Sequence, residues 1–418
     1  MTTRNASSAQ PARSSFGLAP AWVMLLAGVV AALHVGKVAP AVPILQQALG
    51  LSLVEAGFLI SLVQIASVFI GLAVGLAVSG WGYKRSVVAG LAILATSSIA
   101  GGWSQGAAAL LTFRALEGLG FLLVVMPAPS LIRRLVTPKR MSTMLGFWST
   151  YIPFGSAVAL LVGPLVITTT GWQSWWWGLG LIAAAMCVWV MVAIPTDPRQ
   201  VAAPASAGGH TTGHGTWQHR LALTLSAPGP WAVALSFAVY AGQWLAVVGF
   251  LPSIYAAAGV SGGLAGLLTA LAAGINMVGC IGSGRLLTHG VAPHRLLYTG
   301  FTVMSTCVVV AFVSVGGVSA PPVVQYLAIL LFSAVGGYIP GTLFTLAVKL
   351  APNESTVSTT VGWMQQWSSS GQLLVPPLVG WVAGITGGWS WTWVICLACG
   401  LTGLALARFI ATLVNTSR

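Results

Sequence analysis

Lys37 is the residue whose position most strongly suggests a chemical role, because its ammonium group falls inside a long apolar stretch. That stretch runs from about residue 20 to residue 47. A lysine at the middle of a membrane helix costs roughly 2.5–3.5 kcal/mol on insertion scales, so it needs a partner, water or a function. His34 lies three residues earlier, on the same helical face. We interpret this segment as a cationic site that faces a pore.

Two prolines follow Lys37 closely and weaken the helix there. Pro40 and Pro43 each remove a backbone donor, which frees the carbonyls of Gly36 and Ala39. Inside a membrane such carbonyls are tolerated only where other groups or water satisfy them. The prolines therefore support the prediction that polar groups or water surround this part of the first span.

Arg114 is a second cation in an apolar stretch, and Glu117 follows it by three residues. At ~1.5 Å rise per residue, Lys37 and Arg114 both lie roughly 10–15 Å below the outer surface. A guanidinium offers an anion a planar fork and an ammonium a movable point charge, so the two cations could share one anion. Alternatively, Arg114 pairs with Glu117 in a structural role and leaves Lys37 as the uncompensated cation. Lys37 could also extend toward the outer surface or bind backbone carbonyls.

The composition places these residues in a membrane protein built from helices. Of 418 residues, 57% are hydrophobic and 5% are charged, and the mean hydropathy is +0.92. The apolar runs are continuous, whereas strands of an outer-membrane barrel alternate polar and apolar residues. The net charge of +13 comes from basic residues scattered between the runs, so orientation in the bilayer explains it and nucleic-acid binding does not. Only four acidic residues are present, few for a cation transporter.

Twelve apolar runs of spanning length predict twelve transmembrane helices in two groups of six. They cover about 20–47, 53–79, 86–104, 107–132, 143–169, 174–195, 229–257, 262–287, 295–315, 321–350, 356–384 and 389–413. The predicted parts are an N-terminal tail at 1–19, a first bundle at 20–195, a linker at 196–227, a second bundle at 228–413 and a C-terminal tail at 414–418. The histidines of the linker are too irregularly spaced to indicate a metal site.

The basic residues predict the orientation of the chain. Fifteen of the 17 lysines and arginines fall at the termini or in even-numbered loops, and the odd-numbered loops carry none. By the positive-inside rule both termini are cytoplasmic, and we expect a multi-pass protein of the bacterial inner membrane.

The two halves also repeat one another at an offset of 209 residues. Six residues of the first half recur in the second: Pro43, Gly50, Ser52, Ala56, Gly57 and Gly75 as Pro252, Gly259, Ser261, Ala265, Gly266 and Gly284. Two similar bundles in the same orientation form a parallel repeat, and the substrate site of such proteins lies between the halves. By this offset His34 corresponds to Gln243, and Lys37 to Ala246.

The sequence resembles the major facilitator superfamily over nearly its whole length, and two motifs carry the resemblance. Residues 75–85 resemble its loop between spans 2 and 3, although Ser79 replaces the usual acidic residue. Residues 114–120 match its Arg-x-x-x-Gly-x-Gly pattern. Within that family, residues 37–52 resemble the cyanate and 2-nitroimidazole transporter branch. The resemblance implies an all-α membrane protein of two pseudo-symmetric six-helix bundles, with small anions or small polar heterocycles as substrates.

The second half offers hydrogen bonds and aromatic rings where the first half offers charge. Its candidate substrate-binding residues, each of which could instead serve packing, are Tyr240, Gln243, Trp244, Tyr338, Trp363, Gln365 and Gln366. Tryptophans near the outer span ends, among them Trp172, Trp175 and Trp176, are typical of an interfacial belt.

These residues predict a transporter and no enzyme. The sequence contains no phosphate-binding loop, metal-ligand cluster or nucleophile–base pair, so we expect no catalytic residue, metal or cofactor. Glu117 and His34 are the buried groups that could carry a coupled proton, and facilitated diffusion stays open as an alternative. We therefore expect a monomer that imports a small organic or inorganic monoanion by alternating access, with Lys37 as the main binding cation. The alternative is an exporter of small neutral or aromatic compounds.

Overall fold

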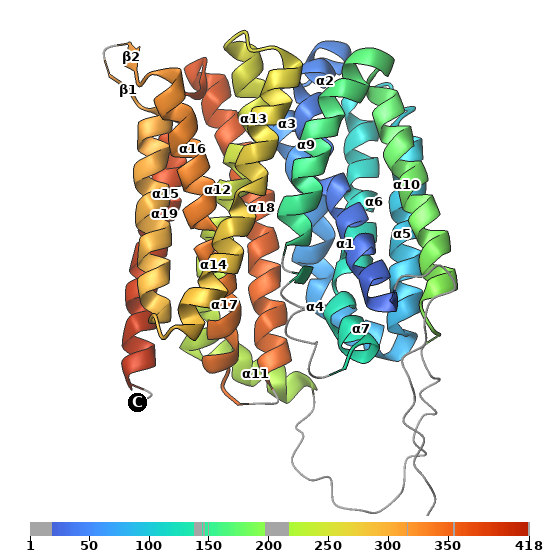
Figure 1. The fold of residues 1–418 in the computed structure, drawn as a ribbon, viewed down its shortest axis with the longest axis vertical. Coiled ribbons are helices and arrows are strands. Elements are labelled where there is room, and N and C mark those ends of the chain that lie inside the picture. The colour runs from blue at the N-terminus through green and yellow to red at the C-terminus, as the bar shows by residue number, and fades with distance from the viewer. Residues whose placement is uncertain are drawn as a thin grey trace, which may run out of the picture.

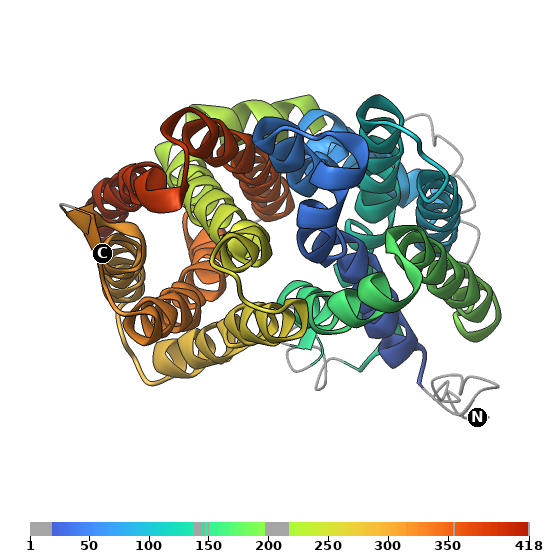
Figure 2. The ribbon, with the colours of Figure 1, turned by 90° about the horizontal axis from the view of Figure 1, so that it is seen from above.

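The chain folds into two helical bundles that lie side by side (Figures 1 and 2). The computed structural model describes residues 19–137, 144, 147, 148, 150–196, 217–315, 317–353 and 356–416. Nearly all of the predicted N-terminal tail and most of the predicted linker lie outside these ranges. So do four other basic residues counted in the topology argument: Lys139, Arg140, Arg199 and Arg418.

The first bundle contains six spans, three of them assembled from shorter helices. Its elements are α1 (Pro20–Gly36), η1 (Ala39–Ala41), α2 (Val42–Leu49), α3 (Leu53–Ser61), η2 (Leu62–Gln64), α4 (Ile65–Trp81), α5 (Tyr83–Gly101), α6 (Ala107–Val125), α7 (Ala128–Leu135), α9 (Tyr151–Thr170) and α10 (Trp172–Ala193).

The second bundle has the same number of spans and follows a short helix, α11, inside the segment predicted to be a linker. Its elements are α11 (Trp217–Ser226), α12 (Pro228–Ala257), α13 (Gly262–Gly274), α14 (Asn276–Thr288), α15 (Pro293–Phe312), β1 (Ser314–Val315), β2 (Val318–Ser319), α16 (Pro322–Gly336), α17 (Tyr338–Lys349), α18 (Val357–Thr386), η4 (Trp389–Trp391) and α19 (Thr392–Thr416). The two short strands pair as an antiparallel hairpin. We call the end of the molecule that carries them the hairpin end (Figure 1).

The predicted all-α architecture is confirmed. Within the described residues, ten helical stretches are long and apolar enough to cross a membrane. α5 and α18 take the places of the two other predicted spans. Both carry polar residues: α5 has Lys84 and Arg85 in its first turn, and α18 contains several glutamines and serines.

The first span is broken beside Lys37, as its prolines predict. α1 ends at Gly36, a single 3₁₀ turn spans Ala39–Ala41, and α2 restarts at Val42. Pro40 and Pro43 both occupy first-turn positions, where a missing N–H leaves no intrahelical bond unmade. The break thus gives each proline a favourable position and leaves the last carbonyls of α1 without helical partners.

Glu55 has a local structural role at the start of α3. The Ser52 hydroxyl accepts a hydrogen bond from the Glu55 N–H at 3.2 Å, and the Glu55 carboxylate accepts one from the Ser52 N–H at 2.9 Å. This reciprocal capping box satisfies two donors that the first turn of a helix leaves free.

The two bundles meet along a seam, and two glycines make close contacts across it at the hairpin end. A Cβ added at Gly57 of α3 would lie 2.6 Å from Pro377 Cα of α18, and one at Gly266 of α13 would lie 2.6 Å from Pro164 Cγ of α9. Only glycine permits such an approach. The repeated pair Gly57 and Gly266 therefore has the same task in both halves: each lets its helix touch a proline of the opposite bundle.

Candidate functional site

A charged cluster lies buried in the first bundle, and it contains Lys37, His34, Arg114 and Glu117. Their exposed fractions are 0%, 0%, 2% and 1%. Lys37 Nζ forms an ion pair with Glu117 Oε1, and Arg114 Nη1 lies 2.8 Å from Glu117 Oε2. His34 Nδ1 lies 3.7 Å from Glu117 Oε1. One carboxylate therefore stands between two cations.

The expectation that Lys37 lacks a counter-ion is wrong, because α6 brings Glu117 against the break in the first span. Lys37 Nζ also donates to Ser98 Oγ of α5 at 2.9 Å, and it lies 4.7 Å from the ring centroid of Trp176 on α10. Its backbone carbonyl accepts a hydrogen bond from Trp175 Nε1 at 3.0 Å. Lys37 thus points into the interior of the first bundle, not toward the outer surface.

These contacts also correct the interpretation of three tryptophans as an interfacial belt. Trp172, Trp175 and Trp176 are only 5%, 5% and 2% exposed. They belong to the face of α10 that packs inward and shields the charged cluster. Trp391, which is 52% exposed, does fit an interfacial position.

Arg114 satisfies backbone carbonyls that two broken spans leave free. Its guanidinium donates to four carbonyls at the ends of α1 and α3: Leu59 at 2.9 Å, His34 at 2.5 Å, Val35 at 3.4 Å and Ile60 at 3.5 Å. With the bond to Glu117, all five guanidinium donors are engaged. In this conformation Arg114 pairs with Glu117, the alternative role considered for it, and has no donor left for an anion.

The cluster carries more positive than negative charge. With Lys37 and Arg114 protonated, Glu117 ionised and His34 neutral, the net charge is +1. A buried excess charge is costly where water is excluded. The cluster could therefore accept one further negative charge on electrostatic grounds, although that charge would have to displace existing partners.

Packing contacts revise the correspondence between the halves around Lys37. Gly155 faces Ala32, and Gly36 faces Ala159, in the first half; the matching contacts in the second are Gly371 with Ala238 and Gly242 with Val375. In both pairs the residue of α12 is numbered 206 higher than its counterpart in α1. By this offset Lys37 corresponds to Gln243, and His34 to Tyr240. The three-residue difference from the repeat offset arises because the first span breaks where α12 continues. Gln243 is fully buried, and neither amide atom has a hydrogen-bond partner among the described residues.

Three of the aromatic candidates make their contacts inside the second bundle. Tyr240 and Trp244 join a neutral network with Asn276 and Ser333: Asn276 Nδ2 donates to the Tyr240 hydroxyl at 3.1 Å, and Trp244 Nε1 donates to Ser333 Oγ at 3.0 Å. Tyr338 lies against Gly282 of α14. This network occupies the position that the charged cluster takes in the first bundle.

Uncharged side chains form hydrogen bonds across the seam between α18 and the second span. Gln64 Nε2 donates to Gln372 Oε1 at 3.1 Å, and Ser369 Oγ donates to Gln64 Oε1 at 3.2 Å. Gln366 Nε2 donates to the Val68 carbonyl at 2.6 Å. Sequence reasoning selected Gln366 but missed Gln64 and Gln372, although an isolated glutamine within an apolar run was an available signal.

The other two candidates on α18 differ in their surroundings. Trp363 packs its ring against Trp231 of α12, with centroids 4.9 Å apart, and against Trp367. Gln365 is half-buried on the same helix as Gln366. Among the described residues, no group of three or more His, Cys, Asp or Glu side chains could hold a metal ion.

Comparisons with known proteins agree with this architecture. The sequence profile described as Major Facilitator Superfamily matches residues 24–374. The tetracenomycin C resistance and export protein of Streptomyces glaucescens is 29% identical over 199 residues, or 44% of this chain and 35% of that protein. The cyanate transport protein CynX of Escherichia coli is 26% identical over 262 residues, or 62% of this chain and 63% of that protein.

Two solved structures share the fold at low identity. A D-xylose–proton symporter gives a TM-score of 0.72 at 18% identity, covering 93% of this chain and 96% of its own. A bacterial homologue of the human lysosomal transporter Spinster, in an inward-facing and unoccupied conformation, gives 0.71 at 15% identity, covering 94% of each chain.

Proposed function

The chain belongs to the major facilitator superfamily, and on this basis we propose that it exports small uncharged polar or aromatic compounds by alternating access. The proposed location is the bacterial inner membrane with both termini in the cytoplasm, as the basic residues favour. In this orientation the hairpin end faces outward. The protein would act as a monomer without a cofactor.

The observation that carries the proposal is the chemistry of the seam. The hydrogen bonds described above between α18 and the second span join amides, a hydroxyl and a backbone carbonyl, and none involves a charged group. In a transporter with two rocking halves, the substrate binds between the halves and replaces contacts of this kind. Amides supply both donors and acceptors, which suits an uncharged heterocycle or polar arene. The similarity to a protein named for resistance and export supports the outward direction.

In this proposal the charged cluster couples transport to protons and does not hold the substrate. Glu117 and His34 are the coupling candidates. Protonation of Glu117 would remove the shared partner of Lys37 and Arg114, and so loosen the tie between α1, α3 and α6. A change of charge at such a contact favours one conformation over another and so shifts the equilibrium between them.

Import of a small monoanion is the second candidate, and the net charge of +1 in the cluster favours it. The anion would reach Lys37 by displacing Glu117, while Arg114 keeps its carbonyl partners. The similarity to a cyanate transport protein supports this candidate.

Flux measurements with reconstituted protein separate the two candidates. Liposomes carrying the purified chain would be loaded with 2-nitroimidazole or cyanate, and flux would be followed in both directions under a proton gradient. We expect nitroimidazole flux that is lost in Gln64→Ala and Gln372→Ala and kept in Gln47→Ala, a matched control at an exposed position of α2. Cyanate flux that is lost in Lys37→Ala, without nitroimidazole flux, would establish the second candidate and refute the first.

A further inference from the structure

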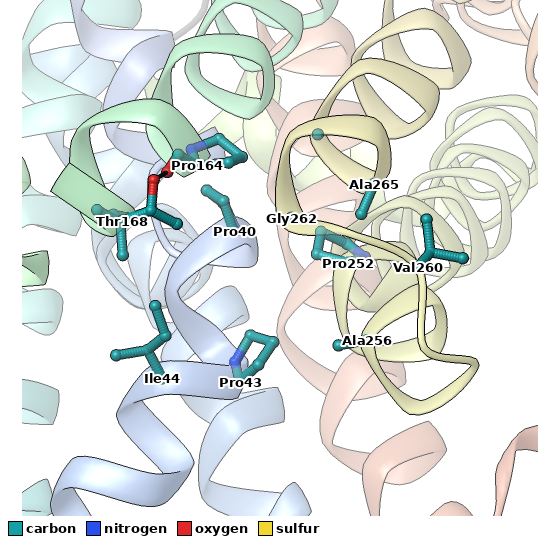
Figure 3. Close-up of a pocket in the computed structure, with 12 residues that line it drawn as sticks. Pro40, Pro43, Ile44, Pro164, Thr168, Pro252, Ala256, Val260, Gly262 and Ala265 are labelled. Carbon is teal, nitrogen blue, oxygen red and sulfur yellow. Dashed lines mark hydrogen bonds between the residues drawn. The ribbon is translucent and has the colours of Figure 1, made fainter.

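A cavity at the hairpin end lies between the two bundles, apart from both the charged cluster and the glutamine seam. Its volume is about 140 Å³. Figure 3 shows its walls: Pro40, Pro43 and Pro164 face it from the first bundle, and Pro252, Ala256 and Val260 from the second. None of these residues was proposed above to bind a ligand.

The lining of the cavity fits an apolar ligand. Thr168 is the polar side chain among the lining residues, and its hydroxyl already donates to the Pro164 carbonyl at 2.8 Å. A charged or strongly polar ligand would therefore find few hydrogen-bond partners on these walls to replace the water that it displaces. Proline rings fix the backbone at four lining positions, which limits collapse of the walls. An engineered apolar cavity of about 150 Å³ binds benzene, so this pocket, which is open to the surface at Thr168, Ala256 and Gly262, has the volume for one such ring.

We propose that this cavity binds one uncharged arene of benzene size, and that the bound arene holds the two bundles together at the hairpin end. The site exists only while the bundles touch there, because its walls come from both. Within its lining, Gly266 lies against Pro164 across the seam, so separation of the bundles would carry the two walls apart. A ligand that binds the closed form alone shifts the equilibrium toward that form in proportion to its occupancy. Only the consequence for transport rests on the proposed function; binding of the arene does not.

Fluorobenzene is a suitable probe, because its fluorine signal reports binding to the full-length protein in detergent or nanodiscs. We expect saturable binding of one molecule per chain. Ala256→Leu, which fills the cavity, should weaken the affinity at least tenfold, and Val260→Phe should do the same. Ala257→Leu, at the adjacent and equally exposed position that does not line the cavity, should leave the affinity unchanged.

Distances between spin labels test the conformational part independently of any transported compound. Labels would be attached at Gln47→Cys on α2 and Gly263→Cys on α13, exposed positions at the hairpin end of opposite bundles. Fluorobenzene should shift the distance distribution toward the shorter, closed population in the wild-type background and not in Ala256→Leu. Binding that is absent, or equally strong in both filling variants, would overturn the site. Binding without a distance shift would overturn its effect on the seam, whereas a failed flux assay would count only against the proposed function.

Discussion

Replacing Glu117 with glutamine should destabilise the protein far more than replacing Lys37 with methionine. Glu117 is the shared acceptor of Lys37 and Arg114, and all three side chains are at most 2% exposed. Glutamine keeps the shape of the side chain but removes its charge. With His34 neutral, the cluster carries +1 in the wild type, +2 in E117Q and 0 in K37M.

The magnitudes follow from these charges. Removal of one partner from a buried ion pair costs about 3–5 kcal/mol, because the other charge stays buried without compensation. In K37M the Glu117 carboxylate keeps its ion pair with Arg114 at 2.8 Å. Only the charged hydrogen bonds of Lys37 are lost, which should lower the free energy of unfolding by roughly 1.5–3 kcal/mol. The double variant K37M/E117Q has the wild-type net charge of +1 in this cluster. Its cost should therefore fall below the sum of the single costs by roughly 0.5–3 kcal/mol.

The free energy of unfolding can be measured by denaturant titration in detergent, followed by the fluorescence of the 18 tryptophans. Glu55→Gln serves as the control, because glutamine can keep the capping box at this partly exposed position, and loss of the charge near the helix N-terminus should cost about 0.3–1 kcal/mol. Equal costs for E117Q and K37M, or strictly additive costs in the double variant, would refute the assignment of Glu117 as the shared counter-ion.

Three further predictions follow from the seam, the guanidinium and the helix cap. Gly57→Ala should hinder closure at the hairpin end and lengthen spin-label distances there, because its Cβ would meet Pro377; Gly384→Ala, with nothing within 4 Å, should not. Arg114→Lys should lower the free energy of unfolding by about 2 kcal/mol or more, since three donors cannot replace five, and a smaller loss in denaturant titration would contradict the carbonyl contacts. Ser52→Ala should cost about 1 kcal/mol in the same titration, and no measurable loss would argue against the capping box.

The correct identification of the charged residues and the wrong pairing of Lys37 have a common physical cause. A charged residue in an apolar run stands out in the sequence, because burial in a membrane is costly wherever it occurs. Its partner does not stand out, since Lys37 and Glu117 are 80 residues apart and meet only through the rotation of α6 against α1. The packing of α10 against α1 likewise directs the ring of Trp176 at Lys37, whereas sequence position alone suggested the membrane interface.

In the second half, too, one correspondence could be seen in the sequence and another only in the structure. The repeat of Gly57 as Gly266 was visible in the sequence, and the structure gives it a reason in the contacts with Pro377 and Pro164. The correspondence of Lys37 with Gln243 was not visible, because the break in the first span shifts the register by three residues. Only the packing of α1 and α12 against their neighbours reveals it.

The sequence by itself determined the helical membrane fold, the division into two related bundles and the set of buried charged residues. These depend on local hydrophobicity, on proline and glycine positions and on the energetic cost of charge in lipid, all of which act residue by residue. Only the tertiary structure decided which charges neutralise one another, which carbonyls Arg114 satisfies and where a cavity stays open. Those outcomes depend on how helices far apart in the chain are rotated and brought into contact.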